Sequence, residues 1–107
     1  MEIRQYQVIV VNLDPTVGSE IKKTRPCVVI SPDEMNKYLR TVTVAPVTST
    51  SKEYMTRVKF DHEGAASWIA IDQIRTIDRI RIVKIVGELD AKAIKKVKAV
   101  IKETFVD

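Results

Sequence analysis

Several polar side chains stand beside short apolar segments that have the length of β-strands. They are Arg25, Thr48, Ser49, Asp72 and Gln73. An arginine carries a permanent charge on a planar fork that matches phosphate oxygens, while hydroxyl, amide and carboxylate groups supply hydrogen bonds and a proton acceptor. The strand ends of a small barrel meet at a common rim. If the barrel brings these side chains together, they suit the chemistry of a phosphodiester.

RNA would supply its own nucleophile at such a site, the 2′-hydroxyl, so no metal ion or cofactor is required. Arg25 would stabilise the negative charge that develops around phosphorus. The Thr48 hydroxyl would donate to a non-bridging oxygen, and Asp72 or Glu20 would accept the 2′-hydroxyl proton. A structural interpretation stays open for each residue. Arg25 would then pair with Glu20 or Asp72, Thr48 would be an ordinary turn hydroxyl, and Asp72 would cap a loop.

The sequence lacks the residues and motifs that other catalytic chemistries need. The chain has one histidine, His62, and one cysteine, Cys27, which excludes a metal site built from several His or Cys ligands. It contains no P-loop, dinucleotide-binding fingerprint or nucleophile elbow. Cys27 lies in an apolar run and is expected in the core. His62 lies in the stretch 61–64, which is expected to form a surface turn.

Composition and charge limit the class of protein. The 107 residues, 45% hydrophobic and 30% charged, are typical of one folded soluble domain spanning 1–107. The net charge of +4 favours an acidic partner, nucleic acid or protein, although a solvated lysine surface would give the same charge. No apolar run approaches the length of a membrane span, and the first residues do not resemble a signal peptide. A cytoplasmic protein is expected.

The hydrophobic pattern predicts many short strands and then one helix. Strands are expected over 8–13, 26–30, 41–45, 55–60, 67–71 and 80–86, with a short helical turn over 33–38. Pro46 is expected to end the third strand. A slip of the apolar phase between Ile82 and Val83 indicates a bulge. This order predicts a mainly β (α+β) fold, a small barrel or curled sheet of twisted strands with a C-terminal helix.

The terminal helix follows Gly87, where the hydrophobic period changes. Asp90 is the expected N-cap. The face expected to dock on the sheet consists of Ile94, Val97, Ile101 and Phe105. Lysines cover the rest of the helix and are interpreted as a solvated face rather than a binding surface.

Three segments together resemble a known family. They are NLDPTVGSE at 12–20 followed by Arg25–Pro26, PVTS at 46–49 and DQIRTID at 72–78. In this order and spacing they resemble the signature of the MazF/PemK toxins of type II toxin–antitoxin systems. The resemblance implies an SH3-like barrel that forms a homodimer and cleaves single-stranded mRNA at a specific sequence without a metal. It also implies an antitoxin whose acidic C-terminal segment occupies the RNA groove.

The resemblance also assigns roles to residues. Arg25 and Thr48 would be the catalytic pair, while Glu20 and Asp72 stand where some members use acidic residues. The loop 15–24 would gate RNA, and here it has no glycine beyond Gly18, so we expect it to be stiffer and more basic than in other members. The residues expected to bind RNA are Pro15, Ser19, Lys22, Lys23, Ser49 and Gln73.

Two alternative functions remain open from the sequence. A related small-barrel toxin family binds DNA gyrase and cuts nothing, and a catalytically inert relic would only bind RNA or antitoxin. The presence of both Arg25 and Thr48 favours the nuclease. For the dimer, residues 42–47 and the C-terminal helix are expected to contribute to the interface. Trp68 is expected to be a core aromatic rather than a base-stacking residue.

Overall fold

In the part of the chain that the structure describes, seven strands precede a C-terminal helix. The computed structural model describes residues 1–13, 24–50 and 54–106. The strands are β1 (Gln7–Asn12), β2 (Thr24–Val29), β3 (Thr41–Thr48), β4 (Arg57–His62), β5 (Ala65–Ala70), β6 (Arg75–Asp78) and β7 (Ile82–Glu88). The helices are α1 (Asp33–Tyr38) and α2 (Ala91–Ile101), with the short helical turns η1 (Ile71–Gln73), η2 (Arg79–Arg81) and η3 (Lys102–Val106).

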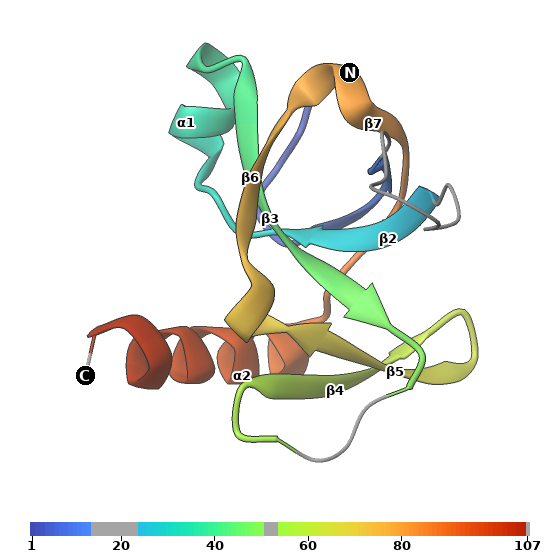
Figure 1. Cartoon of the computed structure of the whole chain (residues 1–107), viewed down its shortest axis with the longest axis vertical. Coiled ribbons are helices and arrows are strands. Elements are labelled where there is room, and N and C mark those ends of the chain that lie inside the picture. Colours follow the sequence, from blue (N-terminus) through green and yellow to red (C-terminus); the bar gives the residue numbers. More distant parts are fainter. Residues whose placement is uncertain (14–23, 51–53, 107) are drawn as a thin grey trace, which may run out of the picture.

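The strands form a curled antiparallel sheet in the order β4-β5-β3-β2-β1-β7, and β6 pairs with β3. β3 is the longest strand and belongs to both halves of the curl (Figure 1). Its first half pairs with β6 and its last two residues pair with β5. The predicted class is confirmed: the chain is a half-barrel of twisted antiparallel strands with a C-terminal helix.

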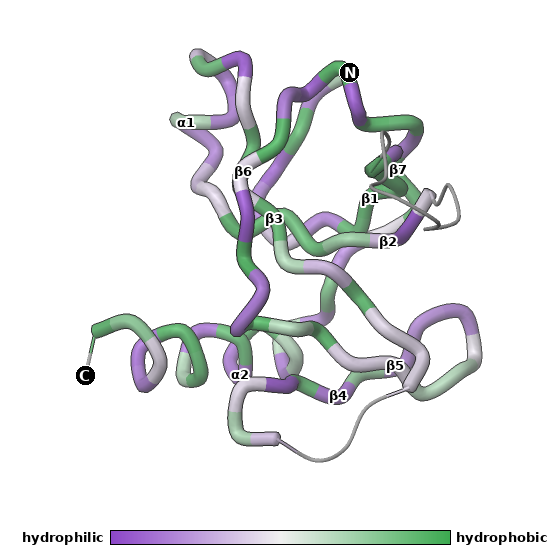
Figure 2. The backbone as a smooth tube through the Cα atoms, viewed as in Figure 1, coloured by the Kyte–Doolittle hydropathy of each residue, from purple (hydrophilic) through white to green (hydrophobic). Residues whose placement is uncertain are grey.

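Alternation along the central strands builds two hydrophobic clusters, one on each face. One cluster contains Val28, Ala45 and Ile69 and includes Val97 of α2. The other contains Cys27, Val29 and Val44. Hydrophobic colouring accordingly follows β1, β2 and β3 in Figure 2. Burying a Val or Ile side chain contributes about 1.5–3 kcal/mol, so these clusters hold the strands in one register. That register fixes where the ends of β2 and β3 meet.

The sequence predicts that Pro46 ends β3, and this prediction is wrong. The strand continues to Thr48, and Pro46 stands opposite Cys27 of β2. On its other side β3 pairs with β6 as far as Val44 and with β5 from Val47. Pro46 therefore lies where the neighbouring strand changes, and a residue without a backbone N–H is tolerated at that point.

The predicted bulge in the last strand is confirmed. Val10 pairs with Lys84 and Val11 pairs with Ile82, so Val83 has no partner in the β1–β7 ladder. The sequence pattern located this irregularity because an extra residue reverses the faces on which side chains lie. β6 was not predicted as a strand. Its four residues carry only Ile77 as a buried side chain, which is too weak an alternation to recognise.

Helix α2 begins as predicted and ends differently. The Asp90 side chain accepts a hydrogen bond of 2.8 Å from the Ala93 N–H, which confirms the N-cap. Val97 is fully buried. Phe105, however, is 59% exposed and lies in η3, where the helix widens to π geometry. The wider turn changes the angle between successive residues, so the prediction that Phe105 docks on the sheet is wrong.

Residues 42–47 are largely buried within the chain itself. β3 is an interior strand, and Val42, Val44 and Val47 are at most 4% exposed within the chain itself. The expectation that this segment contributes to a dimer interface stays a prediction, and within it only Thr43 is partly exposed. No helix within the described residues has the length and apolar character needed to cross a membrane.

Candidate active site

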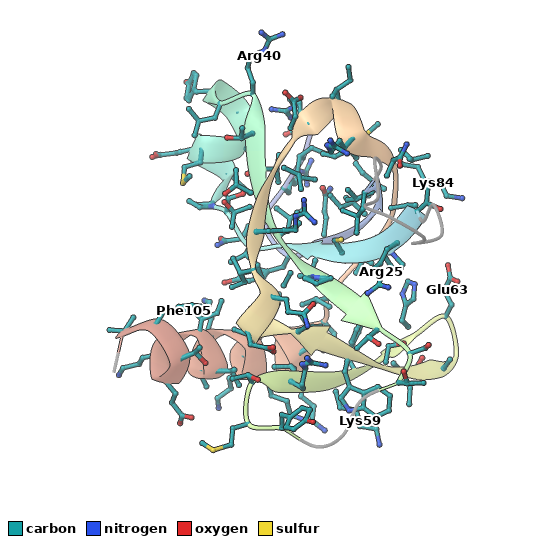
Figure 3. The ribbon with its side chains drawn as sticks, in the orientation of Figure 1. Arg25, Arg40, Lys59, Glu63, Lys84 and Phe105 are labelled. Carbon is teal, nitrogen blue, oxygen red and sulfur yellow. The ribbon has the colours of Figure 1, made fainter. Side chains whose placement is uncertain are left out.

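A groove of about 520 Å³ opens where β2 begins and β3 ends. Its polar lining comes from three places in the chain: the start of β2, the end of β3 and the hairpin that joins β4 to β5. The polar residues that line it include Arg25, Thr48, Ser49, His62, Glu63 and Ser67. Figure 3 shows Arg25 and Glu63 on the same side of the molecule, near the end of β3.

The strand register explains why Arg25 and Thr48 meet. Cys27 stands opposite Pro46 in the β2–β3 ladder. Two residues further, the same register brings Arg25 alongside Thr48, and both lie on the face that carries Cys27. Pro26 restricts the backbone directly after Arg25. The guanidinium is therefore carried by a fixed strand, which lowers the entropy lost when it binds an anion.

Arg25 is half-buried and forms no ion pair with another described residue. The expected pairing with Asp72 is not formed, because Asp72 pairs with Arg57 instead. Below Arg25 lies the buried Cys27, as predicted for a core residue. Burial raises the pKa of the Cys27 thiol to about 12, although the charges of Arg25 and Arg75 act in the opposite direction. The thiol therefore stays protonated and is no candidate nucleophile.

The Thr48 hydroxyl organises the loop that follows β3. Its Oγ1 donates to the Thr50 carbonyl at 2.9 Å and accepts from the Thr50 N–H at 3.3 Å. Thr48 is thus a turn hydroxyl as well as a groove residue. To donate to a phosphate oxygen, the hydroxyl must rotate away from the Thr50 carbonyl, and the N–H contact can persist while it does so.

Asp72 and Gln73 do not line this groove. They belong to η1, beyond the end of β5, whereas the groove lies at the start of that strand, where Ala65 is found. The Arg57 side chain binds Asp72 with its fork, Nε at 2.9 Å from Oδ1 and Nη2 at 3.3 Å from Oδ2. This hydrogen bonding lowers the pKa of Asp72. A rim shared by all three strand ends is therefore not formed within the chain.

Sequence reasoning missed His62 and Glu63. His62 is the last residue of β4, half-buried, and not part of a surface turn. The turn itself is Glu63–Gly64, and both residues have positive φ, 53° and 82°. This backbone is the one that two-residue hairpins favour. The signal was present in the sequence, since His62 continues the inward alternation of Val58 and Phe60.

Trp68 also differs from its prediction. Its side chain is half-buried and belongs to neither hydrophobic cluster. It stands opposite Thr48 on one side and Lys59 on the other, so all three side chains share one face of the sheet. The Lys59 ammonium lies 5.8 Å from the centroid of the indole ring. The prediction of a core aromatic is wrong, because Trp68 is only half-buried and packs in neither cluster.

The remaining predicted residues are Pro15, Ser19, Glu20, Lys22 and Lys23, which lie outside the described residues. Among the described ones, no three His, Cys, Asp or Glu side chains gather in the way that would hold a metal ion.

The curled half-barrel, with an arginine and a threonine at one groove, places the chain in the class of small-barrel proteins. The family follows from its similarity to known proteins. Residues 4–105 match the model of the PemK-like, MazF-like toxins of type II toxin–antitoxin systems. The chain belongs to this family.

Individual relatives are similar over nearly their whole length. "Endoribonuclease EndoA" of Bacillus subtilis is 33% identical over 91% of this chain and 89% of its own. "Endoribonuclease MazF" of Staphylococcus saprophyticus is 34% identical over 89% and 84%. Among solved structures, MazF of Deinococcus radiodurans (TM-score 0.83, 24% identity) covers 100% of this chain and is itself covered to 99%. A MazE–MazF complex from the same organism (TM-score 0.82, 25% identity) covers 96% and is covered to 95%.

Proposed function

We propose that this chain is the toxin of a type II toxin–antitoxin system and acts as a sequence-specific endoribonuclease on single-stranded RNA, inhibiting growth by cutting mRNA. Family membership and the endoribonuclease names of the two relatives support this function. The observation that carries it for this chain is the groove in which Arg25 and Thr48 lie together. Neither the gyrase-binding nor the inert alternative explains why Arg25 and Thr48 lie alongside each other in the β2–β3 register.

The chemistry is transesterification at phosphorus. The RNA 2′-oxygen attacks the adjacent phosphorus, a P–O2′ bond forms, and the P–O5′ bond breaks. The products are a 2′,3′-cyclic phosphate and a 5′-hydroxyl. Arg25 binds the non-bridging oxygens with its fork as negative charge accumulates there, and Thr48 donates one further hydrogen bond. Because the nucleophile belongs to the substrate, the scheme needs no cofactor.

RNA binding is shared between the groove and its surroundings. Ser49 lines the groove, and in this scheme it would contact the RNA beside the scissile phosphate. Gln73 lies in η1, away from the groove, so in this scheme it would contact a more distant nucleotide. Lys22 and Lys23 would add attraction that is independent of sequence.

The acidic partner in this scheme is an antitoxin. Solved relatives include an endoribonuclease in complex with its cognate antitoxin from a mycobacterial species. A net charge of +4 complements the acidic C-terminal segment that we propose for this chain's own antitoxin. We also infer a homodimer in the cytoplasm. The edge strand β7 and the turn before it expose apolar side chains that a second copy would cover, with Ile80 at 85% and Val83 at 50%.

Cleavage of a long RNA in EDTA, followed by analysis of the new ends, tests the proposal. We expect fragments with 2′,3′-cyclic phosphate and 5′-hydroxyl ends and a short motif shared by the cut sites. A strict requirement for magnesium, or 5′-phosphate ends, would contradict the mechanism. Intact RNA combined with arrested DNA replication in cells would favour the gyrase alternative instead.

A further inference from the structure

The groove holds titratable groups that the proposed mechanism has not used. Cleavage of the P–O5′ bond releases an alkoxide, which needs a proton, and the 2′-hydroxyl must lose one. Asp72 lies outside the groove and is bound by Arg57. Besides Arg25, the titratable side chains that line the groove within the described residues are His62 and Glu63.

The β4–β5 hairpin carries His62 to the groove. It is the last residue of β4 and pairs with Ala65 of β5. The turn beyond it is fixed by a 2.9 Å hydrogen bond from the Gly64 N–H to Asp61 Oδ1. Ala65 opposite is small, so it leaves room beside the imidazole, whose other neighbour is the Phe60 ring at 5.9 Å between centroids. The imidazole is thus positioned by the sheet rather than by a loop.

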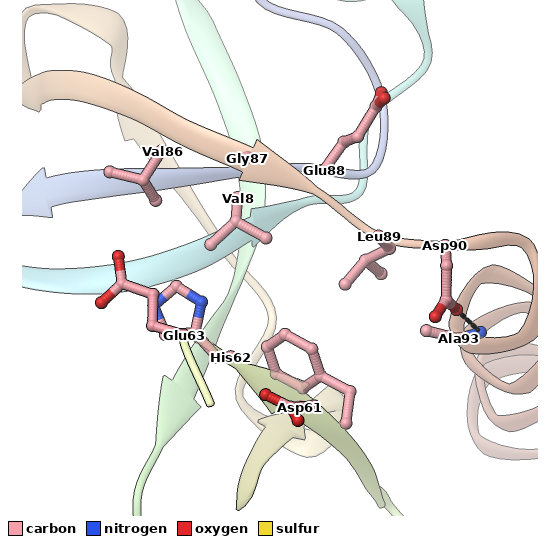
Figure 4. Close-up of a pocket in the computed structure, with 11 residues that line it drawn as sticks. Val8, Asp61, His62, Glu63, Val86, Gly87, Glu88, Leu89, Asp90 and Ala93 are labelled. Atoms are coloured by element: carbon pink, nitrogen blue, oxygen red, sulfur yellow. Dashed lines mark hydrogen bonds between the residues drawn. The ribbon is translucent and has the colours of Figure 1, made fainter. Parts of the chain in front are cut away.

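His62 also borders a second cavity. A cleft of about 260 Å³ lies between the β4–β5 hairpin, β7 and the start of α2. Within the described residues, the charged side chains that line this cleft are Asp61, Glu63, Glu88 and Asp90, and Arg25 and Glu63 line the groove. Figure 4 shows His62 and Glu63 together at one wall of this cleft, facing Val8 and Val86. His62 and Glu63 line both cavities, so this wall separates an acidic cleft from the groove that contains Arg25.

We propose that His62 and Glu63 are the proton-transfer pair of the RNA cleavage reaction, an inference that rests on the proposed function. The Glu63 carboxylate accepts the 2′-hydroxyl proton as the P–O2′ bond forms. The His62 imidazolium donates its proton to O5′ as the P–O5′ bond breaks. Water then returns a proton to the imidazole and removes one from Glu63, so the enzyme is unchanged. Imidazole suits the acid role because its proton exchange falls near neutral pH.

The test uses a short RNA that contains the mapped cut site and a second RNA with sulfur in place of the bridging 5′-oxygen at that site. A thiolate leaves without a proton, so the sulfur substrate needs no general acid. Single-turnover rates are measured for the wild type, His62→Gln, Glu63→Gln and Glu88→Gln across pH 5–8.5. Glu88 lines the cleft and not the groove, which makes Glu88→Gln the matched control.

We expect His62→Gln to slow cleavage of the oxygen substrate by about 10²-fold or more at pH 6. The wild-type rate on the oxygen substrate should fall as pH rises across this interval, and His62→Gln should lose that dependence. The sulfur substrate should be cut by His62→Gln close to the wild-type rate, which also shows that the variant is folded. Glu63→Gln should be slow on both substrates, and Glu88→Gln should cut both at the normal rate.

Several results would overturn the inference. One is a His62→Gln enzyme with the wild-type rate and pH profile; another is a defect that the sulfur substrate does not relieve. Full activity of Glu63→Gln would remove Glu63 as the proton acceptor. The proposed function fails separately, and visibly, if the wild type cuts no RNA at all.

Discussion

Arg25 and Arg57 are both strand arginines, yet their surroundings differ. Arg57 begins β4 and holds the Asp72 carboxylate with two nitrogen atoms, and its guanidinium also lies 5.5 Å from the Tyr54 ring. Arg25 is the second residue of β2 and lines a groove. It forms no ion pair with any other residue that the structure describes. Asp72 balances the charge of Arg57, whereas no carboxylate among the described residues pairs with Arg25.

Residue type alone therefore does not mark a catalytic arginine. Both arginines stand next to strands in the sequence, and the DQIRTID motif made Asp72 look like a partner for the cleavage site. The β4–β5 hairpin instead delivers Arg57 to Asp72 at one end of the pair and His62 to the groove at the other. We therefore expect substitutions at the groove to change chemistry and substitutions at the Arg57–Asp72 pair to change stability.

Thr48→Ala should have a large effect on the rate of RNA cleavage. Loss of the hydroxyl removes one hydrogen-bond donor to the transition state and should slow cleavage by about 10²-fold. The fold should persist, because Thr48 is only half-buried. Single-turnover cleavage measures the loss, with circular dichroism as the folding control. Thr48→Ser keeps the hydroxyl and should keep most of the rate; equal losses in both variants would point to packing instead.

Asp72→Asn should have a smaller effect, and on stability. The pair with Arg57 is partly exposed, at 14% for the arginine and 36% for the aspartate side chain. Solvent screening limits such a pair to at most about 1 kcal/mol of unfolding free energy. Urea unfolding at pH 7 measures the change, and RNA cleavage should stay near the wild-type rate. A large loss of cleavage with unchanged stability would return Asp72 to the catalytic site.

The smallest predicted effect is the pH dependence of that stability difference. The pKa of Asp72 is lowered in the folded chain by the Arg57 hydrogen bonds. The unfolded carboxyl titrates near its usual value of about 4. The stabilisation is therefore complete above that pH and disappears as pH falls through the lower, folded value. Unfolding of the wild type and Asp72→Asn should differ by a constant amount from pH 5 to 8 and converge in acid. A difference that grows in acid would have the wrong sign.

Much of the fold followed from the sequence because it depends on short-range patterns. The β2 core, the bulge at Val83 and the Asp90 cap each leave a local signature in apolar phase or residue type. Pro46 misled the prediction because its tolerance depends on where β5 replaces β6 beside β3, which is a tertiary fact.

The site was only half predictable for the same reason. Arg25 and Thr48 were found from their family motifs and their places at the ends of apolar segments. His62 was missed because the turn consists of two residues, Glu63 and Gly64, rather than the predicted four, so that His62 belongs to β4. Asp72 was placed wrongly because the direction of β5, which decides which end meets the groove, is not written in any local pattern.

The assignment of Arg25 to the active site is tested by measuring Arg25→Lys and Arg57→Lys side by side. Each variant keeps its charge and loses the planar fork. Single-turnover cleavage and equilibrium RNA binding are measured for both. Arg25→Lys should slow cleavage by about 10²-fold or more while RNA affinity falls far less, because sequence-independent attraction persists. Arg57→Lys should cut at nearly the wild-type rate. Equal rates in both variants, or a larger loss in Arg57→Lys, would contradict the assignment of Arg25 to the active site.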